Sequence, residues 1–211
     1  MGLGLAGKQG QALACGLHAE QGDKVRLALG GVLADRLAKR FRVAFRVQLS
    51  NPEIQPDRLA LPDFLQTKVP LVPLRRRNDK PKPKRVEPRY DDPEFQRAFG
   101  ELVDLLAAET DRKPIFEFAD LMMYGFWGEG HTWPFTDHPF PDAMTAERTF
   151  VRMLDVQLEH WPRTPLVTNT QPDWSRVGNS ELVDRTIRSH NWLRTDTIFV
   201  ENEQIEAISN R

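Results

Sequence analysis

The chain has 211 residues, a length that allows one large domain or two small ones with a sizeable core. Its 29 Lys and Arg against 30 Asp and Glu give a net charge of -1, which argues against a dedicated nucleic-acid-binding protein. The single cysteine excludes an intramolecular disulfide and a thiolate metal cluster. No apolar run approaches the ~20 residues that span a bilayer, so we expect no membrane partner.

Two patterns near the amino terminus resemble functional motifs. Gly2, Gly4 and Gly7 fit the spacing of a dinucleotide-binding loop, but no strand precedes them, so they predict no cofactor site. Residues 12–15 are similar to a lipoprotein cleavage box, yet the polar residues 8–11 interrupt the apolar region that a signal peptide requires. We therefore expect neither a cofactor nor a signal peptide, and the cellular compartment stays open.

The first elements follow from hydrophobic periodicity. A possible first strand covers 12–17, and Asp23 is suited to cap a helix over 23–40. Residues 41–49 alternate apolar and polar side chains, which predicts a strand. Prolines punctuate 61–74, so this stretch predicts a short extended piece over 69–72 and no helix.

Residues 75–89 form a basic segment with eight basic and two acidic side chains, a local charge of +6 against -7 for the remainder. Its prolines break regular structure, and its composition offers little apolar surface to bury. We expect an exposed, mobile loop whose deletion leaves the fold intact. A separate hypothesis makes it an arm that binds nucleic acid or another polyanion.

From Asp92 onward, helices and strands alternate. Asp92 followed by a proline at the first helical position predicts a helix to about Glu109. The later elements are a strand over 115–122, a helix from Thr145 to about Trp161, a strand over 166–169, a helix over 180–190 and a strand over 197–200. Such alternation predicts parallel strands joined by crossover helices, hence an α/β fold, with an open sheet or a closed barrel both possible.

Residues 120–132 lie just past the carboxyl end of the strand over 115–122, the edge at which parallel α/β folds place their active sites. Tyr124 and Trp127 offer flat apolar faces, and Glu129 and His131 can transfer protons. This set suits a carbohydrate, because sugar C–H faces pack on aromatic rings while carboxylates perform acid/base work. The competing interpretation makes both aromatics core residues and Glu129 a turn cap.

Residues 124–131 read YGFWGEGH and resemble the Tyr-Gly-x-Trp-Gly-Glu-x-His signature of bacterial β-galactosidase-like glycoside hydrolases, which have a (β/α)8 TIM-type barrel. Weaker similarities cover 18–23, where Ala19 replaces a proline of the family, and 45–47, 91–93 and 192–196. The resemblance implies a carbohydrate substrate, no cofactor, and Glu129 as the general acid/base.

The resemblance also implies a partial barrel. The chain offers about six strands, whereas a (β/α)8 barrel typically needs about 250 residues. Because the family takes its nucleophile from strand seven, we expect a truncated and inactive barrel whose unpaired strand edges favour oligomers or aggregates. The alternative is a non-catalytic carbohydrate-binding relative.

Further polar residues at predicted strand ends are candidates for the same site. Arg46 would contact substrate or pair with an internal acid such as Glu20 or Asp120. The other substrate-binding candidates are Trp127, His131, Tyr124, Asn169, Arg194 and Asp196. The possible carboxylate partners of Glu129 are Asp120, Asp196 and Glu201. His131, Asp137 and His138 lack the spacing of a helical zinc site, so we expect no metal.

Overall fold

The computed structural model describes residues 2–5, 12–14, 42–48, 61–74, 86–125, 128–131, 139–169 and 179–194. These residues contain a six-stranded sheet with strand order β2-β1-β3-β6-β7-β8. Its four parallel strands are β3 (Val43–Gln48), β6 (Phe116–Asp120), β7 (Leu166–Asn169) and β8 (Trp192–Arg194). The predicted α/β class is confirmed for this part of the chain, while the helix expected over 23–40 and the strand expected over 197–200 lie outside the described residues.

The amino-terminal strands differ from the prediction of a parallel first strand over 12–17. β1 (Gly2–Leu5) pairs antiparallel with both β3 and β2 (Ala12–Ala14). β2 therefore lies beyond β1 and does not pair with β3. The connection between β1 and β2 has too few residues for a parallel crossover, which takes a dozen or more, so the pair forms antiparallel.

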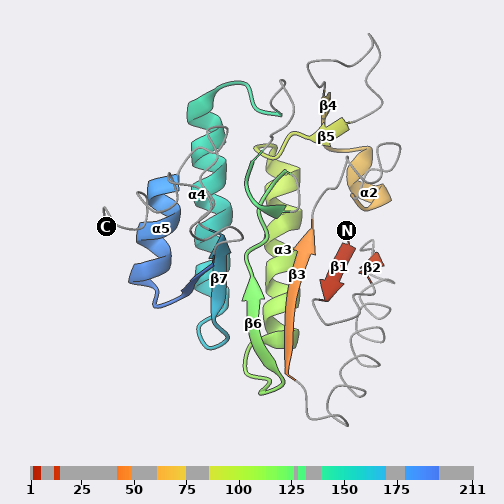
Figure 1. The fold of residues 1–211 in the computed structure, drawn as a ribbon. Helices are drawn as coiled ribbons and strands as arrows, with labels where there is room; N and C mark the ends of the chain where they lie inside the picture. Colours follow the sequence, from red (N-terminus) through yellow and green to blue (C-terminus); the bar gives the residue numbers. More distant parts are fainter. Residues whose placement is uncertain are drawn as a thin grey trace.

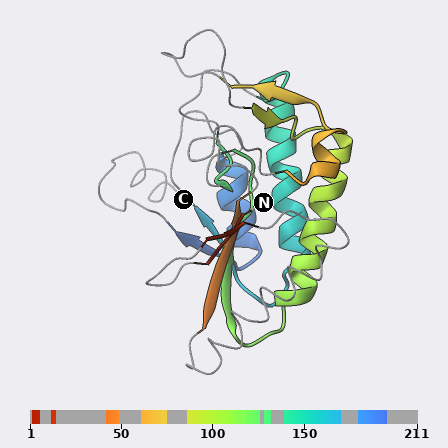
Figure 2. The ribbon, with the colours of Figure 1, turned by 90° about the vertical axis from the view of Figure 1, so that its right-hand side faces the viewer.

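Three helices connect the parallel strands and cover one face of the sheet (Figures 1 and 2). They are α3 (Pro93–Thr110), α4 (Ala143–His160) and α5 (Asn179–Arg188). The predicted start of α3 is confirmed, since the side chain of Asp92 accepts a hydrogen bond from the Glu94 amide at 2.9 Å. α4 begins two residues before Thr145, because the Asp142 side chain caps it. None of the helices that the structure describes is both long and apolar enough to cross a membrane.

The hydrophobic core lies between the sheet and these helices. Val43, Phe45 and Val47 on β3 are all buried, and they belong to the same core cluster as the apolar stripe of α3. The ring of Phe45 meets that of Phe116 edge-on, with centroids 5.5 Å apart. Because side chains alternate along a strand, this burial places Arg46 on the face away from the helices.

A small second sheet pairs β4 (Leu71–Pro73) with β5 (Val86–Pro88) in antiparallel register (Figure 1). The short helix α2 (Asp63–Gln66) precedes it, so the prediction of no helix over 61–74 is wrong. A single helical turn fits here because Pro62 occupies the N-cap, where its missing N–H is not needed.

The basic segment 75–89 departs from the predicted exposed loop at its carboxyl-terminal end. Residues 75–85 lie outside the described residues, but 86–88 form β5, and Glu87 is only 1% exposed. The hydroxyl of Tyr90 donates a hydrogen bond to the Glu87 carboxylate, and Arg89 pairs with Asp91 at 2.7 Å. The end of the segment is held in place by its pairing with β4 and by the hydrogen bond between Tyr90 and Glu87.

Candidate functional site

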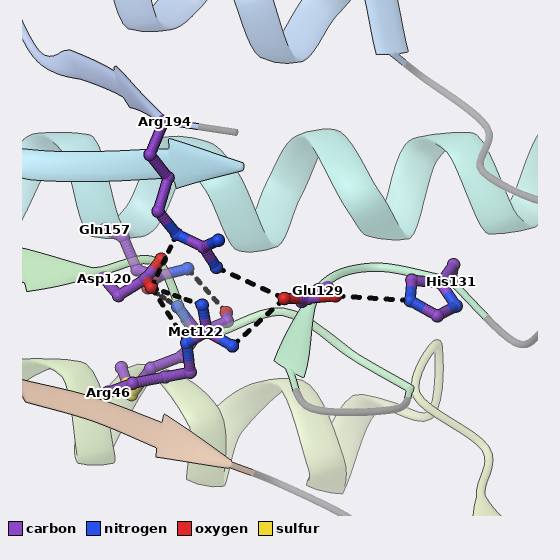
Figure 3. Close-up of polar contacts among 7 residues, drawn as sticks. All are labelled: Arg46, Asp120, Met122, Glu129, His131, Gln157 and Arg194. Atoms are coloured by element: carbon purple, nitrogen blue, oxygen red, sulfur yellow. Dashed lines mark hydrogen bonds and ion pairs between the residues drawn. The ribbon is translucent and has the colours of Figure 1, made fainter. Parts of the chain in front are cut away.

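Charged side chains from three parallel strands meet at the carboxyl-terminal edge of the sheet (Figure 3). Arg46 on β3 and Asp120 at the end of β6 are direct partners in the parallel register. Arg194 ends β8 and is in register with Asn169, the last residue of β7. Register therefore places all these residues at the edge where α/β folds bind ligands.

Asp120 lies between two arginines. Its Oδ2 atom accepts from Arg46 Nε at 2.9 Å and from Arg46 Nη2 at 2.5 Å. The same oxygen accepts from Arg194 Nε at 2.9 Å. The Asp120 side chain is 12% exposed, so these bonds compensate a carboxylate that is largely removed from water.

Glu129 contacts the same two arginines from the loop that follows β6. Its Oε1 atom accepts from Arg46 Nη1 at 3.1 Å and from Arg194 Nη2 at 3.2 Å, while Oε2 lies 3.5 Å from His131 Nε2 (Figure 3). The Glu129 side chain is 9% exposed. Each guanidinium thus bridges the two carboxylates, and we call Arg46, Asp120, Glu129 and Arg194 the arginine–carboxylate cluster.

The arginine–carboxylate cluster carries two positive and two negative charges in a partly buried setting. Two guanidinium groups beside Glu129 favour its ionised form, because a nearby opposite charge stabilises the charged state. An ionised Glu129 can act as a base, as a nucleophile or as a stabiliser of developing positive charge. A reaction step that needs a protonated Glu129 requires at least one of these ion pairs to break.

A glycine-dependent turn returns Glu129 over the end of the sheet. Gly125 and Gly130 have φ values of 77° and 78°, in the left-handed region that favours glycine. An added Cβ at Gly125 would lie 1.8 Å from the backbone oxygen of His131, and one at Gly130 would lie 2.6 Å from the Phe150 ring. The turn expected from the glycines is present, and both positions leave no room for a side chain.

Tyr124 is a core residue and not an exposed platform for a sugar. It is 1% exposed, and its ring contacts those of Tyr90, Phe140 and Phe150. The expectation that Tyr124 binds substrate is therefore wrong, because the residue packs beneath the turn. The hydroxyl of the buried Tyr90 also accepts a hydrogen bond from the Gly125 amide at 3.2 Å, which ties the turn to the second sheet.

Gln157 on α4 supports the end of β6, a role that was not predicted from the sequence. Its side chain accepts from the Met122 amide and donates to the Met122 carbonyl, both at 2.8 Å (Figure 3). The residue is 1% exposed. An amide side chain within the apolar stripe of the helix was the available signal, because a buried polar group needs hydrogen-bond partners.

The structure brings together part of the predicted site. Arg46, Glu129, His131 and Arg194 lie together, and the predicted pairing of Arg46 with an internal acid is confirmed for Asp120. Asn169 ends β7, but its side chain is not described. The candidates that lie outside the described residues are Glu20, Trp127, Asp137, His138, Asp196 and Glu201.

Neither a metal site nor a comparison with known proteins assigns a function to the chain. Within the described ranges, no group of three or more His, Cys, Asp or Glu side chains could hold a metal ion. Comparison of the chain with protein-family models, with curated proteins and with solved structures gave no match. The functional proposal therefore depends on the chemistry of the arginine–carboxylate cluster.

Proposed function

We propose that the chain is a glycoside hydrolase-like protein that acts on a carbohydrate, with Glu129 as the reacting carboxylate. The observation that supports this proposal is the placement of Asp120 and Glu129 against the same two arginines at the carboxyl edge of a parallel sheet. Glycoside hydrolysis needs a carboxyl group that serves as acid/base, and α/β folds bind substrates at this edge.

In this proposal Glu129 and Asp120 have different roles. Glu129 lies on the turn, and its Oε2 atom is also 3.5 Å from His131 Nε2. Asp120 accepts three hydrogen bonds through one oxygen and holds both guanidinium groups in position. Glu129 is therefore the acid/base candidate, and Asp120 is its positioning partner.

The proposal includes a (β/α)8 barrel, of which the four parallel strands would form an arc. Two features support it. The order β3-β6-β7-β8 follows the sequence without reversal, as it does around a barrel. The connecting helices also lie on one side of the strands (Figure 2), whereas a doubly wound sheet carries helices on both faces.

A non-catalytic carbohydrate-binding protein is the second candidate. Both carboxylate oxygens of Glu129 already have a charged or polar neighbour, and two of these neighbours are permanent cations. Such pairing opposes protonation of Glu129, and a general acid must begin the reaction protonated. This candidate predicts saturable sugar binding without hydrolysis.

The test is to assay the purified chain on a panel of aryl glycosides beside two matched variants. Hydrolysis by the unaltered chain would show that the expectation of an inactive barrel is wrong. In that case Glu129→Gln, which removes the proposed acid/base, should lower the rate by roughly 100- to 10,000-fold. Glu117→Gln changes another arginine-paired glutamate, which lies within β6, is 39% exposed and bonds Arg42 at 2.9 Å, and it should leave the rate unchanged.

Three outcomes would count against part or all of the proposal. Hydrolysis that persists in Glu129→Gln would remove Glu129 from the mechanism. Sugar binding without hydrolysis by the unaltered chain would favour the binding protein. If no glycoside is hydrolysed and no sugar binds, both candidates fail.

A further inference from the structure

A polar pocket lies at the opposite edge of the sheet from the arginine–carboxylate cluster, beside the loops 111–115 and 161–165. These loops lead into the amino-terminal ends of β6 and β7 (Figure 1). The pocket has a volume of about 370 Å³. Its charged lining consists of Arg42, Arg112, Lys113, Arg163 and Glu117, and Trp192 lies on its wall. None of these residues belongs to the arginine–carboxylate cluster.

The lining has an excess of positive charge, with four cations and one carboxylate. Arg42 is paired with Glu117 at 2.9 Å. Arg112 is 72% exposed, and its Nε atom is 4.0 Å from Asp111 Oδ2, a long and weak ion pair. Within the part of the chain that the structure describes, no ion pair engages the Arg163 side chain. Arg112 and Arg163 are therefore the two cations that are most available to an anion.

The loops that carry these two arginines are joined by buried hydrogen bonds. Asp111 is 8% exposed, and its Oδ1 atom accepts from the amides of Arg163 at 3.0 Å and Thr164 at 2.8 Å. The Arg112 backbone has a φ of 84°, a region that residues other than glycine rarely adopt and that recurs at ligand-binding sites. The loops thus present both cations from a fixed backbone.

Trp192 adds an aromatic surface to the pocket. The residue is 46% exposed, although its ring also contacts that of Phe118 at a centroid distance of 5.9 Å. An exposed indole beside several cations suits a ligand that has both a flat ring and more than one negative charge. Planar rings stack on tryptophan, and arginine matches the geometry of phosphate.

We propose that this pocket binds a small phosphorylated compound with a planar ring, the chemical class to which nucleoside phosphates belong. Arg112 and Arg163 contact the phosphates, and Trp192 stacks on the ring. This site is independent of the proposed carbohydrate site, because the two lie at opposite edges of the sheet.

The test is a calorimetric titration of the full chain with ADP, inorganic pyrophosphate and adenosine. ADP should bind more tightly than either of the other two. Arg112→Gln and Arg163→Gln should each weaken the binding of ADP and of pyrophosphate by about 3- to 10-fold, as the loss of a solvent-accessible charged contact implies. Trp192→Leu keeps an apolar contact with Phe118 and should weaken ADP binding by at least about 5-fold while leaving pyrophosphate unchanged.

Two control variants separate this pocket from other basic surfaces. Arg188→Gln removes an exposed cation of α5 that does not line the pocket, and ADP binding should not change. Lys82→Gln combined with Lys84→Gln removes charge from the basic segment, and binding should again persist. Thermal melting confirms that each variant is folded.

Three results would overturn the proposal. The first is the absence of saturable ADP binding by the folded chain. The second is ADP affinity that is insensitive to Arg112→Gln and Arg163→Gln, or that is lost in the double lysine variant. The third is equal affinity for ADP and pyrophosphate, which would exclude a ring contact with Trp192.

Discussion

Arg46 and Asp120 are direct partners in the parallel register of β3 and β6, and the guanidinium of Arg46 extends beyond Asp120 to Glu129. Arg194 makes the same two contacts from β8. Glu129 lies on a turn, yet its carboxylate is held by side chains that belong to the sheet. The position of the candidate acid/base therefore depends on strand register as well as on its own loop.

The first prediction concerns this dependence. Asp120→Asn removes the negative charge of a carboxylate that accepts three hydrogen bonds from Arg46 and Arg194. The substitution should lower the free energy of unfolding by about 1–3 kcal/mol. Glu117→Gln breaks an exposed pair on the same strand and should cost only about 0–1 kcal/mol. Urea unfolding measures both, and equal costs would contradict the structural importance of Asp120.

The sequence was most informative where a local signal determines the element. The alternation along β3 and the capping pair Asp92-Pro93 each predicted an element that the structure contains. Arg46 could be placed at a strand end for the same reason. Its partner could only be narrowed to a few acids, because register between β3 and β6 depends on packing across the whole sheet.

Arg194 and Glu87 show where local signals fail. β8 has only three residues, and Trp192 and Leu193 are both exposed, so no buried pattern marks the strand that positions Arg194. β5 lies at the end of a basic, proline-rich segment whose composition favours a loop. Its pairing with β4 and the burial of Glu87 depend on residues that are distant in the sequence or that show no hydrophobic periodicity. A single sequence does not reveal such contacts.

The second prediction tests the turn that carries Glu129. Gly125→Ala places a Cβ against the backbone oxygen of His131 and forces alanine to a positive φ, so it should destabilise the protein by at least about 2 kcal/mol. Gly100→Ala is the matched control, because Gly100 lies within α3 with open space around it, and it should stabilise by up to about 1 kcal/mol. Thermal unfolding should give a lower melting temperature for Gly125→Ala than for the unaltered chain, and an equal or higher one for Gly100→Ala.

The third prediction concerns the link between the second sheet and the turn. Tyr90→Phe keeps the ring packed but removes the hydroxyl that donates to Glu87 and accepts from the Gly125 amide, at an expected cost of about 1–3 kcal/mol. A double-mutant cycle with Glu87→Gln should give a coupling energy of at least about 0.5 kcal/mol. Strict additivity in urea unfolding would show that the two side chains do not act together.

The fourth prediction concerns the acid sensitivity of α4. The hydrogen bond from the Thr145 amide to the Asp142 carboxylate, at 2.7 Å, lowers the pKa of Asp142 below its ordinary value, and a further bond with the Thr145 side chain adds to the shift. A carboxyl with a lowered folded-state pKa contributes stability that is fully present above its unfolded pKa, about 3.9, and that is lost as the pH falls through the folded value.

Asp142→Asn separates this charge from the cap itself, because asparagine caps a helix about as well as aspartate but does not titrate. Thermal melting of the two proteins between about pH 6 and pH 2 should show the unaltered chain more stable at the higher pH, with the difference falling towards zero below the unfolded pKa. Glu147→Gln changes an exposed carboxylate of α4 that does not cap the helix, and it should show no comparable convergence. A stability difference between the unaltered chain and Asp142→Asn that stays constant across this range would mean that the ionised Asp142 carboxylate does not stabilise the start of α4.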